Sequence, residues 1–168
     1  MELRDHARHL LQFSRKFTER LLECFKTPDD WVFQIDPKVN HAMWIAGHLA
    51  LVDNSFICRF RPDRGRKPEG WDRLFGFGSQ PQPAAAAYPS PPEVLAYLRE
   101  RRQALLEVLE EMTEDELRAP APAPSERSPI AGAPSVGHGF LFIGYHEGLH
   151  SGQLTVAHRA LGNAPVIG

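Results

Sequence analysis

The stretch LRDHARHLLQFSRKFTERLLEC, residues 3–24, decides the fold of this chain. Its apolar or small residues recur in alternating steps of four and three, at Leu3, Ala7, Leu10, Ser14, Phe17, Leu21 and Cys24. An α-helix places residues with this spacing on one side, so the pattern predicts a helix with a single buried stripe. Such a stripe is typical of the contact between helices in a bundle.

Three further segments have the same helical period. The second helix is predicted to run from an N-cap at Asn40 to about Arg61, the third from Ser90 through Met112, and the last from Pro134 to Leu161. Strand-type alternation is absent over any useful length. We therefore predict an all-α protein, an antiparallel four-helix bundle in which residues 1–168 form one domain.

Residues 62–92 differ in composition from the helical segments, because prolines, glycines and a run of four alanines replace the periodic pattern. We interpret this stretch as a long crossover between the second and third helices. Its aromatic and apolar residues should cover one end of the bundle: Trp71, Leu74, Phe75 and Phe77. A domain boundary is disfavoured, since two helices on either side could not bury two-sided faces.

Charge and composition exclude several classes of protein. The formal net charge is -2, from 19 basic and 21 acidic residues, which argues against a nucleic-acid-binding protein. No apolar stretch approaches the roughly 18 residues that a membrane span requires. The charged N-terminus lacks the apolar core of a signal peptide, and the two cysteines read as buried thiols. A cytoplasmic protein is the expectation.

Residues 145–153, which read YHEGLHSGQ, contain the side chains best suited to chemistry. His146 and His150 are four residues apart, so both imidazoles project from the same face of the last helix. The second helix supplies His48 among apolar neighbours. Three imidazoles facing a bundle interior are costly unless their nitrogens are satisfied, and a metal ion would satisfy them. The spacing alone leaves open that they are ordinary hydrogen-bonded histidines.

The letters HEGLH, residues 146–150, also match the His-Glu-x-x-His pattern of zinc proteases, in which Glu147 would be the general base. Such proteases need a further ligand downstream. No acidic residue follows His150, and the later histidine, His158, lies eight residues on. The sheet that usually accompanies the motif is also missing, so a protease is disfavoured.

Two motifs resemble those of a known family, the DinB/YfiT-like superfamily of metal-binding four-helix bundles. The second helix contains Trp44-x-x-Gly47-His48-Leu49. The last contains His146-Glu147-x-x-His150-x-Gly152-Gln153-Leu154, followed by Arg159-x-Leu161-Gly162. The crossover around residues 71–77 and the stretch 88–90 are similar as well, so the resemblance covers essentially the whole chain.

The resemblance implies a bundle with a long crossover between helices two and three. It also implies a three-histidine metal site open to solvent, with the first ligand at His48 and the others at His146 and His150. Zinc or nickel is the expected divalent ion, and a homodimer the expected assembly. Related enzymes use low-molecular-weight thiols for isomerisation or S-transfer.

The leading functional hypothesis is therefore a metal-dependent transferase or hydrolase that acts on a small molecule, with thiol-dependent S-transfer as one form. Three neutral imidazoles leave a divalent ion with an open position for water or a thiol, whose pKa the ion lowers. Glu147 and Gln153 are candidates for orienting a ligand or handling a proton. Glu147 also has a simpler interpretation as a solvated or interface carboxylate.

The competing hypothesis is a non-catalytic metal-binding or dimerisation module, in which the ion stiffens the bundle. A structural site tends to be closed by a fourth protein ligand. Cys58 and Asp53, both on the second helix, are the residues that could close it. A bundle whose site holds no metal in the cell is a third alternative.

Overall fold

The computed structural model describes residues 2–121 and 133–166, and within these ranges the chain forms helices and no strand. The all-α prediction is confirmed. Four helices are long: α1 (Leu3–Leu22), α3 (Ala42–Phe60), α5 (Pro91–Glu111) and α7 (Val136–Ala160). The others are single turns: α2 (Pro28–Trp31), α4 (Trp71–Phe75), α6 (Glu114–Arg118), and the 3-10 turns η1 (Pro62–Arg64) and η2 (Ala85–Ala87).

Local capping explains where the long helices begin. Helix α5 begins at Pro91, and its N-cap is Ser90, the residue at which the helix was predicted to start; Ser90 forms a capping box with Glu93, and prolines occupy the first turn. Helix α3 starts one residue later than predicted, because the Nδ1 atom of His41 accepts the Trp44 backbone N–H at 3.1 Å and caps the helix in place of Asn40. Helix α7 is capped by Ser135.

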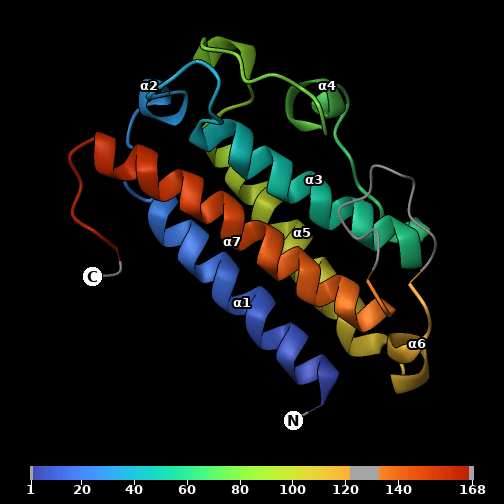
Figure 1. Cartoon of the computed structure of the whole chain (residues 1–168). Coiled ribbons are helices and arrows are strands. Elements are labelled where there is room, and N and C mark those ends of the chain that lie inside the picture. The colour runs from blue at the N-terminus through green and yellow to red at the C-terminus, as the bar shows by residue number, and fades with distance from the viewer. Residues whose placement is uncertain (1, 122–132, 167–168) are drawn as a thin grey trace.

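Helix α1 packs against α7 and α5, and α3 packs against the same two helices (Figure 1). Side-chain contacts give the directions. The Ser14 hydroxyl donates to Glu147 and, four residues on, the Thr18 hydroxyl lies 2.8 Å from that of Ser151, so α1 and α7 run parallel. On α1 and α5 the order is reversed, since Arg15 donates to the Leu98 carbonyl and Arg102 donates to the Leu11 carbonyl.

Helices α3 and α7 are antiparallel, because Trp44 lies beside His150 at one end of α3 and Phe56 beside Phe140 toward the other. It follows that α3 and α5 run parallel. Neighbouring helices are therefore antiparallel in two pairs, α1 with α5 and α3 with α7, and parallel in two, α1 with α7 and α3 with α5. The predicted antiparallel relation holds for the first two pairs and is wrong for the other two. Helices α3 and α5 can run parallel because the segment 61–90 carries the chain back along the molecule before α5 begins (Figure 1).

The segment between α3 and α5 packs on α3 chiefly through the short helix α4. Trp71 and Phe75 of α4 are 8% and 0% exposed and belong to the apolar core. Phe75 fits closely because its ring lies against Gly47, where an added Cβ atom would approach it to 2.3 Å. The prediction for Phe77 is wrong, since its side chain is 79% exposed.

Each long helix contributes one charged side chain to a buried layer: Arg15 from α1, Asp53 from α3, Arg102 from α5 and Glu147 from α7. Their exposed fractions are between 0% and 5%. Arg15 pairs with Glu147 at 2.8 Å and with Asp53 at 3.1 Å. Arg102 pairs with Asp53 at 2.8 Å and with Glu147 at 2.6 Å.

This charged layer lies between two apolar clusters. One contains residues such as Leu21, Leu49 and Leu154, and the other contains residues such as Leu11, Leu105 and Phe140. Two positive and two negative groups neutralise each other inside the layer, and each arginine also donates a hydrogen bond to a backbone carbonyl. The layer is thus a fully paired set of charges, the condition under which burial of charge is tolerated.

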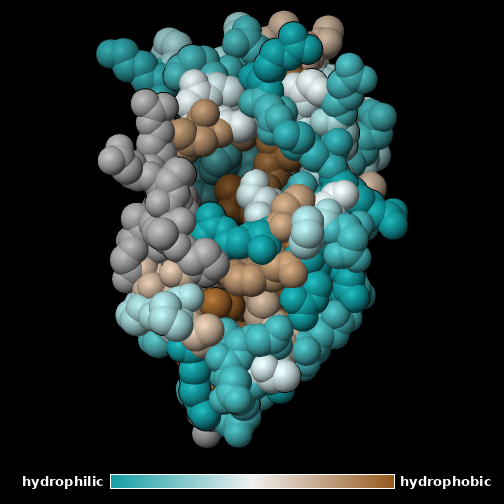
Figure 2. All heavy atoms as spheres, turned by 90° about the vertical axis from the view of Figure 1, so that its right-hand side faces the viewer, coloured by the Kyte–Doolittle hydropathy of each residue, from teal (hydrophilic) through white to brown (hydrophobic). Residues whose placement is uncertain are grey.

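The surface of the molecule is largely hydrophilic on the face drawn in Figure 2, and a hollow near the centre of that face has apolar residues at its bottom. Among the residues that the structure describes, no helix combines the length and the hydropathy needed to cross a lipid bilayer.

The charged layer predicts a large effect of Asp53→Asn on stability. Loss of one carboxylate leaves two buried arginines short of a partner, so the free energy of unfolding should fall by about 3 kcal/mol. Urea denaturation followed by circular dichroism measures this. Glu110→Gln, which removes one of the two exposed partners of Arg8, is the control and should cost far less. Equal effects of the two substitutions would contradict a stabilising role for the layer.

Candidate metal centre

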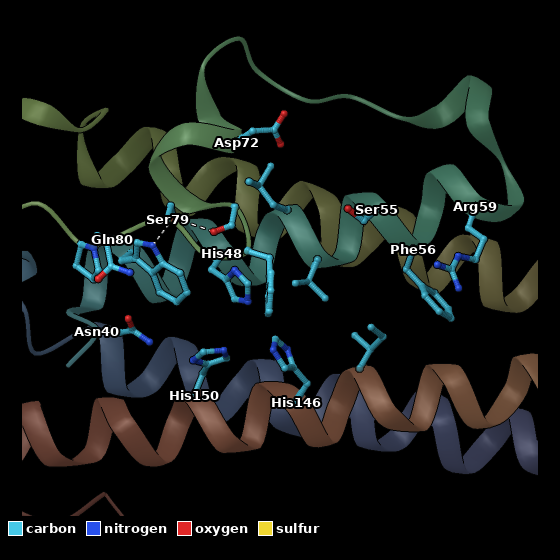
Figure 3. Close-up of a pocket in the computed structure, with 18 of the residues that line it drawn as sticks. Asn40, His48, Ser55, Phe56, Arg59, Asp72, Ser79, Gln80, His146 and His150 are labelled. Carbon is cyan, nitrogen blue, oxygen red and sulfur yellow. Dashed lines mark hydrogen bonds between the residues drawn. The ribbon is translucent and has the colours of Figure 1, made fainter. Parts of the chain in front are cut away.

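Helices α3 and α7 bring His48, His146 and His150 together. One ring nitrogen from each lies within 4.8 Å of the other two. Figure 3 shows His48 pointing from α3 toward the two histidines, which point back from successive turns of α7. The four-residue spacing on α7 and the antiparallel packing of α3 produce this convergence. The structure therefore assembles the three histidines that the sequence singled out.

His48 is held by two groups. Its Nδ1–H donates to the Phe75 carbonyl oxygen at 2.9 Å, and its ring stacks on that of Trp44 with centroids 4.5 Å apart. The Trp44 Nε1–H in turn donates to the Ser79 hydroxyl at 2.8 Å. The hydrogen bond to Phe75 keeps the proton on Nδ1, so Nε2 carries a free lone pair toward the other histidines.

His150 is oriented in the same way by an amide. Its Nδ1 lies 3.2 Å from the Gln153 Oε1 atom, which also accepts a hydrogen bond from the Asn40 side chain. The Nδ1 atom of His146 is buried and has no hydrogen-bond partner among the residues that the structure describes. A buried nitrogen without a partner is costly, and a cation bound between the three rings is a chemically suitable way to satisfy such a cluster.

The electrostatic state of the three rings suits metal binding. Burial, which disfavours the charged form, lowers the pKa of His48, His146 and His150 to about 4 in each case. The rings are therefore neutral at physiological pH, and each can donate a lone pair without first losing a proton. Three neutral imidazoles form a donor set that fits zinc, nickel or copper better than magnesium or calcium.

The three histidines line one wall of a pocket of about 530 Å³. Apolar side chains of α3 and α7 form much of the pocket, including Leu51, Phe56 and Ile143. The loop after α4 also lines the pocket, through Ser79 and Gln80 among others. A small molecule of substantial size could therefore reach the histidines.

Glu147 faces the charged layer and not the three histidines. Its carboxylate is 0% exposed and contacts Arg15, Arg102 and Ser14, so its interpretation as a solvated carboxylate is wrong. Burial alone would raise the pKa of Glu147, but the two arginines outweigh burial and lower that pKa. Successive residues are about 100° apart around a helix, so His146 can face the other histidines while its neighbour Glu147 faces the charged layer.

The two residues considered as a fourth ligand lie elsewhere. Both carboxylate oxygens of Asp53 are bound by Arg102, and one of them also by Arg15. The Cys58 Sγ atom accepts a long contact from Asn54 and lies against Gly65. In the described ranges, the group of side chains placed to share an ion here consists of the three histidines.

Sequence reasoning missed the groups that the crossover segment supplies, namely the Phe75 carbonyl and the Ser79 hydroxyl. The segment has no periodicity, and a backbone carbonyl leaves no trace in a sequence motif. Gly47 was the available signal, because a glycine beside a candidate ligand can mark a close approach of another part of the chain.

The fold and the site together define a class of protein, an all-helical protein with three converging histidines at the wall of an open pocket. The sequence model of the DinB superfamily matches residues 10–154. The chain belongs to the DinB superfamily. A comparison with curated proteins found no match.

The contact between Gly47 and Phe75 generates a prediction about metal affinity. Gly47→Ala should displace α4, break the hydrogen bond from His48 to the Phe75 carbonyl and lower metal affinity about tenfold, the scale on which ligand-orienting groups act. Competition with a chromogenic chelator measures this, and circular dichroism checks the helices. Gly148→Ala is the matched control, because an added Cβ atom there meets nothing within 4 Å. The interpretation fails if the two variants bind metal equally well.

Proposed function

We propose that this protein is a metal-dependent transferase or hydrolase that acts on a small molecule, with S-transfer involving a low-molecular-weight thiol as one form of the reaction. The observation that carries the proposal is the convergence of three neutral imidazoles at the wall of an open pocket. His48, His146 and His150 are the proposed ligands, and zinc or nickel is the proposed ion. Membership of the DinB superfamily supports this assignment.

The residues of the chain have distinct parts in this proposal. When bound, a divalent ion would make a water molecule or a thiol more acidic, and so supply a nucleophile near neutral pH. The Phe75 carbonyl fixes the proton of His48 on Nδ1. Gln153 orients His150 through its Oε1 atom. The apolar side chains of α3 and α7 limit the access of water to the substrate.

An open coordination position favours an enzyme over a non-catalytic metal-binding module. Asp53 and Cys58, the candidates for closing the site, are engaged elsewhere. The pocket reaches the histidines directly, which a purely structural ion would not require. Glu147 is paired within the charged layer, so we assign it a positioning role. We assign a catalytic role to no residue of the chain.

The proposal includes the setting of the site. We propose that residues 1–168 form one domain, a four-helix bundle with its long crossover between α3 and α5; the family match over residues 10–154 supports this. The cytoplasm is the proposed compartment, and two free cysteines, Cys24 and Cys58, are consistent with it.

We also propose a homodimer, supported by exposed apolar side chains on α7 and the adjacent α1. Tyr145, Leu149 and Val156 recur at helical spacing and are 58%, 51% and 51% exposed. Phe13 of α1 is 58% exposed. Gly148 and Gly152 lie between the apolar residues of α7 with open space above them, which would let a second helix approach closely.

Light scattering during size-exclusion chromatography tests the homodimer. The wild-type protein should elute as a dimer at micromolar concentration, and Leu149→Asp should shift it to a monomer because a charge would be buried at the interface. Ile35→Asp, at a residue that is also exposed but lies far along the chain from this stripe, should leave the dimer intact. A wild-type monomer would refute the assembly.

Metal analysis and cobalt substitution test the function. Protein purified without an affinity tag should contain stoichiometric metal, and His150→Ala should lose it while keeping its helices. Cobalt-loaded protein should develop an intense sulfur-to-metal absorption band when a thiol is added, because three protein ligands leave a position for it. The band should be missing from the apoprotein and from His48→Ala.

Two results would contradict the proposal. Full metal retention in His48→Ala, His146→Ala and His150→Ala would remove the site assignment. Stoichiometric cobalt that responds to neither thiols nor azide would mean a closed site, and the protein would then be a non-catalytic metal-binding module.

A further inference from the structure

The pocket continues beyond the three histidines along one face of α3. Leu51, Val52 and Phe56 follow His48 at helical spacing and line the pocket, with Ile143 of α7 opposite. Arg59 lines the far end, eleven residues after His48, which corresponds to a rise of roughly 16 Å along the helix. Figure 3 shows Arg59 pointing into the same space between α3 and α7 as the histidines.

The charges around the pocket are predominantly positive. Lys38 and Arg59 both line it, and neither forms an ion pair with a carboxylate within residues 2–121 and 133–166. The pocket's carboxylate, Asp72, is paired with Lys67. An imidazole side chain carries no negative charge, so the three histidines do not offset these cations. A positive pocket in a chain of net charge -2 selects for anions.

The two cations lie in different surroundings. Near Lys38 the wall carries polar groups, the amides of Asn40 and Gln80 and the Ser79 hydroxyl. Between the histidines and Arg59 the wall is largely apolar. A ligand that extends from the histidines to Arg59 would thus meet apolar side chains first and a guanidinium last.

We propose that the pocket binds an elongated amphipathic acid, whose apolar body packs on Leu51, Phe56 and Ile143 and whose carboxylate pairs with Arg59. The reactive end of this molecule lies at the three histidines, a part that rests on the proposed function. Arg59 is a specificity-determining residue, because a guanidinium binds a carboxylate through a charge-assisted hydrogen bond that a neutral end group cannot replace.

A series of ω-mercaptocarboxylic acids tests this proposal on the cobalt-loaded protein. Mercaptohexanoate, mercaptooctanoate and mercaptoundecanoate are compared with the hydroxyl-terminated thiols of equal length. Dissociation constants come from the sulfur-to-metal band and, independently of cobalt spectroscopy, from titration calorimetry. The best acid should bind about fivefold more tightly than its alcohol, the factor expected of a solvent-accessible ion pair. This preference should decrease with added salt.

Arg59→Gln should abolish the preference for the acid and leave the affinity for the alcohol unchanged. Lys38→Gln is the matched control, since it removes the same charge from the opposite end of the same pocket, and it should keep the preference. Thermal unfolding checks that both variants are folded, as expected for exposed side chains.

Each other outcome decides the matter. A preference that survives Arg59→Gln, or one that Lys38→Gln abolishes, overturns the proposal. Calorimetric binding with an Arg59-dependent preference but without the cobalt band supports the acid-binding pocket and overturns the open metal site of the proposed function. Thiols that give the band without any preference for the acid leave the metal site standing and overturn the amphipathic acid. An absence of binding by both methods overturns both proposals.

Discussion

Four buried charges, one from each long helix, constrain the packing of this protein. Arg15, Asp53, Arg102 and Glu147 satisfy one another only if all four helices are in a single register, because each arginine contacts both carboxylates. Sliding one helix by a turn would move its charge about 5.4 Å into an apolar cluster. Apolar side chains tolerate many packings of similar energy, whereas paired buried charges tolerate very few.

The same register assembles the three histidines. Helix α3 carries both His48 and Asp53, and helix α7 carries Glu147 directly after His146. Once Asp53 and Glu147 are paired with the arginines of α1 and α5, the rotation and register of α3 and α7 are fixed. The faces of these two helices that carry the histidines are then fixed relative to each other. The segment after α3 then completes the site from outside, through the Phe75 carbonyl and the Ser79 hydroxyl. The charged layer positions the histidines, and the crossover orients one of them.

The features that could be predicted from the sequence are those with a period. The stripe of α1 is predicted in part, since Ala7, Ser14 and Leu21 are buried and its other members are only half-buried. The bounds of the long helices within a few residues, and the pairing of His146 with His150, follow from 3.6 residues per turn. The sequence did not reveal that Arg102 and Glu147 are buried, since a charged residue between apolar ones has the same spacing whether it meets water or a partner. The parallel relation of α1 and α7 was also missed, because it depends on the path of the segment 61–90, which has no periodic pattern to show where it ends.

The charged layer also makes the closure of the protein interior depend on the arrival of α7 during synthesis. Arg15 leaves the ribosome early, but its partner Glu147 is 132 residues away in the sequence. Asp53 and Arg102, separated by 49 residues, can meet while the chain is still growing. A chain that ends before α7 therefore has two arginines and one carboxylate where its core should close, and an unneutralised charge keeps that core open to water. The four charges of the layer are balanced only once α7 has joined the other helices, so closure of this part of the core depends on the arrival of that helix.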